Sequence, residues 1–366
     1  MKRSSNRTSP AVLLALNLAL AFIVAGAPAP AQEAGGSGTW AVGERAVPPP
    51  AGASEQLQAA LAAVPAPNVA ASKQQTPQSD EQWLVMQKAT ANANLDQVAS
   101  GFGVSIKKDE IEGVAVYHVT PEKIDPRHSD HVFLHIHGGG YVLSGGDASV
   151  SEAAMVAAAA GIRALSVDYR MPPEHPFPAA VEDVVTVYRH VLEHHSAKSV
   201  AIGGTSAGGG LSLAAVHRFI ALGLDVPGAI YAGTPWADLT KTSDSLFTNE
   251  GLDRILVTYD GFLGAAARLY ADGHDLKDPL LSPVYGDFEG FPPTYLITGT
   301  RDMFLSDTAR THRKLRAAGV VADLHVYEGV AHADYLILVG SPESEDVFAE
   351  VSAFFKKQRA NCCGSP

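Results

Sequence analysis

The sequence predicts an α/β protein in which a mostly parallel sheet is covered by helices on both faces. From Glu112 onward, short runs rich in β-branched residues alternate with helical stretches. Strands that alternate with helices are typical of parallel sheets. The composition agrees with this class, because 46% of the 366 residues are hydrophobic and 18% are charged. A chain of that length and balance can bury a sizeable core.

The first 31 residues are expected to be a secretory signal peptide. Three basic residues precede a short apolar run, 11–27, and small residues follow, with cleavage expected after Ala29 or Ala31. An uncleaved membrane anchor is the alternative, but the run is short for a full span and Asn17 interrupts it. The mature protein is therefore expected to be exported, either periplasmic or secreted, without stable membrane insertion.

A linker and a group of N-terminal helices are expected to follow. Residues 32–50 are rich in glycine, proline and alanine, a composition typical of linkers. Helices are predicted over 54–64 and over about 77–100, each beginning near a serine that can cap it. Residues 51–105 are accordingly expected to form a helical cap on the main domain.

Residues 106–358 are expected to form the α/β domain, followed by a tail, 359–366. Four helices are predicted there, over 151–160, 179–194, 207–222 and 306–318. The segment 240–278 contains no clear strand and is expected to be an insertion over the carboxyl ends of the strands, where such sheets bind ligands. Seven strands are predicted: GVAVYHVT, HVFLHIH, IRALSVDY, SVAIGG, GAIYAG, TYLITG and DLHVYE.

Five glycines surround Ser206 in the stretch SVAIGGTSAGGGLSLAA, 199–215. A phosphate-binding loop is excluded by residue type, because no GxGxxG spacing fits and no lysine stands where a Walker loop requires one. GTSAG, 204–208, instead matches the GxSxG nucleophile elbow, between a predicted strand and a predicted helix. The sharp turn is expected to strain the serine backbone and to present its hydroxyl above the sheet.

A serine hydroxyl becomes a useful nucleophile only with a base, a group that orients the base, and donors for the oxyanion. His332 is the expected base and Asp302 the expected acid, because each directly follows a predicted strand. The chain order Ser206, Asp302, His332 is the order that accompanies the GxSxG elbow. Asp307 is the alternative acid, but it is interpreted instead as a charge at a helix N-terminus.

The expected oxyanion donors are the backbone amides of Gly139, Gly140 and Ala207. The two glycines belong to HGGG, 137–140, which directly follows a predicted strand. Glycines allow the amides to turn inward without side chains in the way. A plain glycine turn is the alternative interpretation of this segment.

Histidines provide two alternative metal sites, and neither is expected. His190 and His194 belong to an HxxEH pattern that a zinc peptidase could use, but a solvated helix face is the favoured interpretation. His131, His135 and His137 alternate along one predicted strand, where they are expected to pack or to form hydrogen bonds.

Charge and cysteine content exclude further classes of site and partner. The net charge of −12 argues against nucleic acid or an anionic membrane surface as the main partner. The two cysteines, Cys362 and Cys363, are adjacent in the tail, where they cannot staple a core. They are expected to be free or to link two chains, and a cysteine metal site is excluded.

Together these motifs resemble the bacterial hormone-sensitive-lipase-like esterases, the family IV or GDXG group of the α/β-hydrolase superfamily. TPWADLT is most similar to the branch of acetyl hydrolases and monoterpene ε-lactone hydrolases. The resemblance implies the α/β-hydrolase fold with a helical cap and no metal or organic cofactor. It also implies Ser206, Asp302 and His332 as the catalytic triad. The similar segments, in chain order, are HGGGYVLSG, VDYRMPPEHPFPAAVED, GGTSAGGGLSLA, TPWADLT, TGTRDMFLSD and GVAHAD.

The resemblance further implies a serine carboxylesterase that hydrolyses short- to medium-chain carboxylic esters through an acyl-enzyme. A lactone hydrolase or an amidase with the same triad is one alternative, and a non-catalytic ligand-binding homologue is another. His332 disfavours the last, because the receptors that resemble this family have lost that base. A homodimer is a further expectation from the family.

Three departures from the family pattern concern the pocket wall. Thr205 stands where many members have aspartate, Met303 where proline is usual, and Ala333–Asp334 where Gly-Phe is common. The family's substrate preferences are therefore not carried over.

Overall fold

The computed structural model describes residues 38, 42, 43 and 46–362. The predicted signal peptide, most of the predicted linker, and Cys363 lie outside the described residues. The chain divides into a short unit, Met1–Pro48, and a compact unit, Pro49–Pro366, which contains every element below. Within the described part of the chain, no helix is both long enough and apolar enough to span a membrane.

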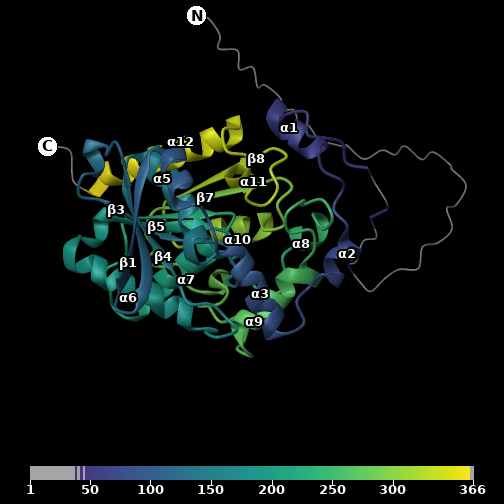
Figure 1. Ribbon diagram of the computed structural model, residues 1–366, viewed down its shortest axis with the longest axis horizontal. Helices are drawn as coiled ribbons and strands as arrows, with labels where there is room; N and C mark the ends of the chain where they lie inside the picture. Colours follow the sequence, from purple (N-terminus) through teal and green to yellow (C-terminus); the bar gives the residue numbers. More distant parts are fainter. Residues whose placement is uncertain (1–37, 39–41, 44–45, 363–366) are drawn as a thin grey trace, which may run out of the picture. The chain divides into compact units, whose positions relative to one another are not determined.

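An eight-stranded sheet forms the centre of the compact unit (Figure 1). Its strand order is β1-β2-β4-β3-β5-β6-β7-β8, with β2 antiparallel to both β1 and β4 and all other neighbours parallel. This confirms the predicted α/β class with a mostly parallel sheet. The strands are β1 (Val104–Ile111), β2 (Val114–Pro121), β3 (Val132–Ile136), β4 (Arg163–Asp168), β5 (Val200–Thr205), β6 (Ala229–Gly233), β7 (Thr294–Gly299) and β8 (Ala322–Tyr327).

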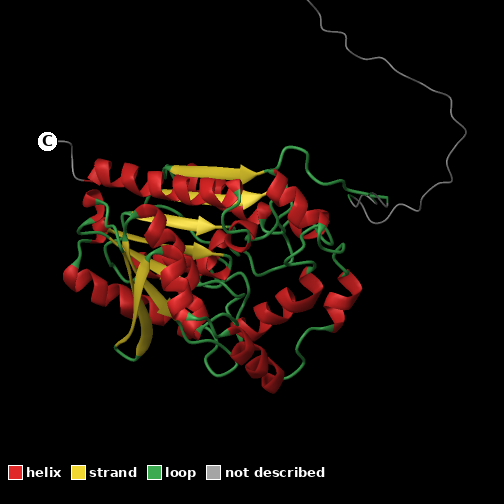
Figure 2. Ribbon diagram, turned by 45° about the horizontal axis from the view of Figure 1, so that its top comes forward, coloured by secondary structure: helices red, strands yellow, loops and turns green. Residues whose placement is uncertain are grey.

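Helices cover both faces of the sheet (Figures 1 and 2). Helices α5 and α12 pack together on one face, and α6, α7 and α10 pack on the other. The helices are α1 (Glu55–Ala62), α2 (Val69–Gln74), α3 (Asp80–Thr90), α4 (Leu95–Phe102), α5 (Ser151–Ala160), α6 (Ala179–His194), α7 (Ala207–Ala221), α8 (Ser245–Thr248), α9 (Gly264–Ala271), α10 (Leu305–Ala317), α11 (Asp334–Ile337) and α12 (Pro342–Cys362). Short 3₁₀ segments η1 (Pro126–His128), η2 (Gly146–Val150), η3 (Ala197–Ser199) and η5 (Pro283–Tyr285), and the π-turn η4 (Tyr259–Leu263), complete the set.

Three expectations about the elements were wrong. The predicted tail, 359–366, begins inside α12, which continues to Cys362. The single helix predicted over 77–100 is two helices, α3 and α4, because the Asn94 side chain accepts a hydrogen bond from Gln97 N at 3.0 Å and starts a new helix. Strand β1 was not predicted, because it is an edge strand with a mostly exposed, charged sequence.

The segment 240–278 contains α8, η4 and α9 and no strand. The arrowheads of the parallel strands point toward the part of the compact unit where these helices and α3 lie (Figures 1 and 2). Lys73 of α2 contacts this insertion through ion pairs with Glu250 and Asp260, at 3.9 and 3.5 Å. The N-terminal helices and the insertion therefore meet at the carboxyl edge of the sheet.

Candidate active site

Ser206 forms the turn between β5 and α7. Its backbone has φ 64° and ψ −124°, a conformation that is strained for a residue with a side chain. Hydrogen bonds hold it in place, because Ser206 N donates to Gly233 O at 2.8 Å and Ser206 O accepts from Gly210 N and Trp236 N. The elbow is thus fixed by β6 and by the loop that follows it.

Two of the glycines around Ser206 lie where there is no room for a side chain. A Cβ at either Gly204 or Gly208 would overlap the carbonyl oxygen of Ile136 on β3. The close approach of β3, β5 and α7 therefore depends on the absence of side chains at these two positions. This is the structural reason for the glycines of the GxSxG pattern here.

The structure brings the three predicted triad residues together. His332 Nε2 lies 2.9 Å from Ser206 Oγ, and His332 Nδ1 lies 3.1 Å from Asp302 Oδ1. All three follow parallel strands, Ser206 after β5, Asp302 after β7 and His332 after β8. Because the carboxyl ends of parallel strands lie along one edge, residues distant in sequence meet there.

Four donors orient the Asp302 carboxylate. Phe304 N and His332 Nδ1 lie 2.8 and 3.1 Å from Oδ1, Thr298 Oγ1 lies 2.8 Å from Oδ2, and Thr234 Oγ1 also donates to Oδ2. Thr234 Oγ1 is also 2.9 Å from His332 Nδ1. Sequence reasoning missed Thr234, although its position directly after β6 places it at the same edge of the sheet.

Charge around His332 favours its protonated form. Burial lowers the pKa of His332, but the nearby Asp302 carboxylate, with a smaller contribution from Asp253, more than offsets this, so the pKa is raised above 6.5. An imidazolium formed during proton transfer is therefore stabilised where it arises.

The predicted oxyanion glycines line the same cavity as Ser206 and His332. Gly139 and Gly140 have φ values of 102° and 65°, which favour glycine. His137 supports the loop by stacking on Tyr169 at a ring separation of 4.0 Å. Ala207 is the first residue of α7, so its amide belongs to the N-terminal turn, where helix N–H groups have no acceptor within the helix.

The cavity has a volume of about 400 Å³ and is largely apolar. The insertion supplies part of its wall through Ile255, Leu256, Phe262 and Leu263. Trp83 of α3 contacts Phe262 at a ring separation of 5.5 Å, so the N-terminal helices support that wall. Among the described residues that line the cavity, Glu152 is the single acidic one.

Comparison with known proteins agrees with this geometry. Residues 133–336 match the family model described as alpha/beta hydrolase fold. The chain belongs to that family. An acetyl-hydrolase from Streptomyces hygroscopicus is 33% identical over 245 residues, which cover 66% of this chain and 81% of that protein.

Solved structures extend the similarity of this α/β hydrolase. The crystal structure of an esterase, E25, is 49% identical with a TM-score of 0.84, covering 87% of this chain and 98% of the other. An esterase described as a member of the bacterial hormone-sensitive lipase family is 31% identical with a TM-score of 0.69, covering 84% and 99%. The predicted resemblance to hormone-sensitive-lipase-like esterases is thereby confirmed.

Asp253 is a site residue of the hydrolase that sequence reasoning missed. It comes from the insertion, is fully buried, and accepts hydrogen bonds from the backbone amides of Ile255, Leu256 and Met303 at 2.9–3.1 Å. Burial, together with the charge of Asp302, raises the pKa of Asp253 to about 6. No sequence motif marks it, so only the fold could reveal it.

Asp307 does not contact His332, so the structure agrees with the choice of Asp302 as the acid. It lies in the first turn of α10, as predicted, but its carboxyl is buried against Ser243 and Asp238 N. Burial raises the pKa of Asp307 to about 8, which weakens the charge that this residue contributes to the helix N-terminus near neutral pH.

The histidines of the HxxEH pattern lie away from the cavity. His190 Nδ1 is 3.6 Å from Glu193, and with His194 they form, in the described part of the chain, the single group of three potential metal ligands. They lie in the last turns of α6, which leads through η3 into the amino end of β5, whereas Ser206 follows its carboxyl end.

The three histidines of the second alternative metal site each have a hydrogen-bond or ion-pair partner nearby. His135 contacts Ser166 and Glu152, His137 Nδ1 lies 2.7 Å from Gly138 O, and His131 Nδ1 lies 2.9 Å from Asp130. This agrees with the expectation that they pack or form hydrogen bonds.

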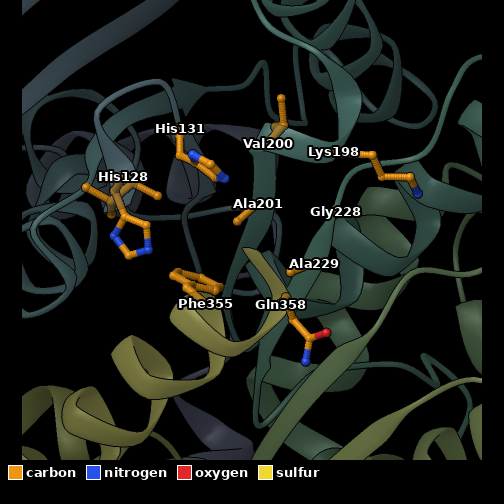
Figure 3. Close-up of a pocket in the computed structure, with 10 residues that line it drawn as sticks. His128, His131, Lys198, Val200, Ala201, Gly228, Ala229, Phe355 and Gln358 are labelled. Atoms are coloured by element: carbon orange, nitrogen blue, oxygen red, sulfur yellow. The ribbon is translucent and has the colours of Figure 1, made fainter. Parts of the chain in front are cut away.

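A second cavity lies at the amino ends of β5 and β6 (Figure 3). His128 and His131 face Phe355 and Gln358 of α12 across it. Its volume of about 20 Å³ suits a single water molecule and is too small for an organic substrate. The substrate site of the hydrolase is assigned to the cavity of about 400 Å³, because Ser206 and His332 line it.

Proposed function

We propose that this α/β hydrolase is a serine carboxylesterase acting on short- to medium-chain carboxylic esters. The observation that carries the proposal is the continuous set of contacts from Ser206 Oγ through His332 to Asp302 at a largely apolar cavity. A nucleophile in contact with a base, and the base in contact with an acid, is the arrangement that activates a serine hydroxyl. The names of the relatives, acetyl-hydrolase and esterase, support esters as the substrate class.

Ester cleavage follows from the geometry in two half-reactions. Ser206 Oγ attacks the carbonyl carbon while His332 Nε2 takes the hydroxyl proton. The tetrahedral intermediate then collapses, the C–O bond to the alcohol breaks, and His332 returns the proton to the leaving alkoxide. A water molecule deprotonated by His332 next attacks the acyl-enzyme, and collapse releases the acid and restores Ser206.

The other site residues stabilise the charges that develop. Asp302 holds the imidazole with Nε2 toward Ser206 and stabilises the imidazolium. The amides of Gly139, Gly140 and Ala207 are proposed to donate to the oxyanion, which is supported by the place of both glycines in the cavity wall and of Ala207 at the start of α7. Loss of one such donor typically raises the barrier by roughly 3 kcal/mol.

The N-terminal helices and the insertion 240–278 are proposed to shape the acyl and alcohol pockets. Ile255, Leu256 and Phe262 lie in the cavity wall, which supports this role for the insertion. A lactone hydrolase or an amidase would use the same triad, but the names of the relatives favour simple esters. A non-catalytic binding role is not favoured, because the base is present and contacts Ser206.

Initial rates on p-nitrophenyl esters of increasing acyl length test this proposal. We expect chelator-insensitive turnover that is fastest on short acyl chains. A folded Ser206→Ala variant should lose at least roughly 10⁴-fold in kcat, since the nucleophile is removed. Substantial hydrolysis by that variant, or inactivation of the wild type by chelator, would refute the proposal.

We further propose export of the mature chain and assembly as a homodimer. Export is supported by the sequence of residues 1–31, and the dimer by the family resemblance. Fractionation of cells expressing the full chain tests the first, and light scattering during size-exclusion chromatography tests the second. A full-length cytoplasmic product or a monomeric mass would contradict the respective statement.

A further inference from the structure

Thr205, the residue before the nucleophile, is the centre of a buried polar network. It is 1% exposed. Its Oγ1 lies 2.5 Å from Glu152 Oε1, 2.7 Å from the Tyr335 hydroxyl and 3.1 Å from the Tyr231 hydroxyl. Its backbone N donates to the other carboxylate oxygen, Glu152 Oε2, at 3.1 Å. Glu152 thus accepts from both the main chain and the side chain of one residue.

The network has a defined direction. The Thr205 hydroxyl donates its one proton to Glu152, so the Tyr335 hydroxyl can bond Thr205 Oγ1 only as a donor, while the Tyr231 hydroxyl donates to the Tyr335 hydroxyl at 3.3 Å. Burial, together with the charge of Glu152, raises the pKa of Tyr335 well above 10, so this phenol keeps the proton it donates. Removing the threonine hydroxyl would leave a carboxylate oxygen and the Tyr335 phenol without this partner.

The network joins the segments that carry the nucleophile and the base. Thr205 ends β5 and precedes Ser206, while Tyr335 lies on α11, three residues after His332. Glu152 lies on α5 and lines the same cavity as Ser206 and His332. The contact between Thr205 and Tyr335 therefore spans the two segments whose separation sets the distance from Ser206 Oγ to His332 Nε2.

We infer that Thr205 and Glu152 are positioning residues that hold Ser206 and His332 at proton-transfer distance. The inference rests on the proposed function, because it deepens the account of that site. A displacement of about 1 Å at a catalytic group can cost about 100-fold in rate. A network that fixes the nucleophile segment against the base segment acts on that distance directly.

The inference also predicts that an aspartate would not suit this chain at position 205. A carboxylate there would face Glu152, where Thr205 Oγ1 now lies 2.5 Å from Oε1. Two carboxylates at such a distance repel, and one is forced to bind a proton. Thr205 and Glu152 therefore form a matched pair.

A matched pair of substitutions at Thr205 tests the inference. Thr205→Val keeps the shape and removes the hydroxyl, whereas Thr205→Ser keeps the hydroxyl. We expect Thr205→Val to lower kcat per active site by about 10- to 100-fold, with KM within about twofold of the wild type. Thr205→Ser should retain kcat within about threefold.

The substitution Glu152→Gln is a second test of the inference. Thr205 N and Thr205 Oγ1 donate to different oxygens of Glu152, so one of them would face the NH₂ group of a glutamine, which cannot accept a hydrogen bond. We expect a loss of kcat similar to that of Thr205→Val. The double variant should lose little more than either single variant, because both remove the same interaction.

Active-site titration separates positioning from folding. A sulfonyl fluoride that labels Ser206 counts the competent fraction, and thermal unfolding reports stability. A merely structural role would lower the competent fraction or the melting temperature and leave kcat per labelled site unchanged. That result, or equal kcat per site in Thr205→Val and Thr205→Ser, would overturn the inference.

The labelling rate keeps the test independent of ester turnover. A wild type that labels at Ser206 without hydrolysing any ester would refute the proposed function alone. The inference would still require slower labelling of Thr205→Val than of Thr205→Ser. Equal labelling rates would overturn it.

Discussion

His332 connects the electrostatics of the site to its chemistry, because it must be neutral to accept the Ser206 proton. Its pKa is raised above 6.5, since the attraction of Asp302 and Asp253 exceeds the penalty of burial. A base with a raised pKa remains protonated, and therefore inactive, over a wider acidic range. Activity is thus lost as the pH falls through this raised pKa.

The pH profile of kcat/KM is the corresponding prediction. We expect its acid limb to have a midpoint above pH 6.5. Asp253→Asn removes a buried negative charge near His332 and should move that midpoint to lower pH. Asp96→Asn, at an exposed position on α4, is the matched control and should leave the midpoint unchanged. A midpoint that stays in place or rises in Asp253→Asn would contradict this account.

At the residue scale, the sequence predicted the three triad residues, because recognisable motifs contain them. Ser206, Asp302 and His332 each directly follow a run of strand-forming residues, and the fold places them in contact. Thr234 is marked in the sequence only by its position directly after β6, and Asp253 is not marked at all, because its buried carboxyl acquires its role from neighbours distant in sequence.

At the scale of elements, the site depends on how closely β3, β5 and α7 approach one another. Gly204 and Gly208 both face the Ile136 carbonyl oxygen, so neither position has room for a Cβ. Helices α5, α6, α7 and α10 begin and end close to their predicted bounds, because their apolar patterns match the faces they bury. No such pattern marks the break between α3 and α4 or the edge strand β1, so neither was predicted.

Two alanine substitutions test the packing of the elbow. Gly204→Ala should lower the free energy of unfolding by about 1–3 kcal/mol or more, because Cβ would overlap Ile136 O. Gly101→Ala, on α4 with open space around it, is the control and should raise stability by up to about 1 kcal/mol. Urea unfolding followed by circular dichroism measures both. A Gly204→Ala variant as stable as the wild type would show that the close approach is not required.

At the scale of the compact unit, the cavity is assembled from segments that are far apart in the chain. Four segments meet at the carboxyl edge of the sheet: the HGGG loop, the insertion 240–278, the turn at Ser206, and the loop after β8 that carries His332. The alternation of strands and helices predicted that edge, but the spatial order β2-β4-β3-β5 depends on crossovers that periodicity does not encode. The insertion also contacts the segment that carries His332, because Arg254 forms an ion pair with Asp334 at 2.5 Å.

Covalent labelling tests the central claim, that Ser206 is a nucleophile activated by His332, most directly. The wild type, Ser206→Ala and His332→Ala are treated with a sulfonyl fluoride and analysed by intact mass and peptide mapping. The account predicts a single adduct on Ser206 in the wild type, none in Ser206→Ala, and labelling slowed by at least about 100-fold in His332→Ala. An adduct on another residue that accompanies loss of activity, or undiminished labelling without His332, would contradict it.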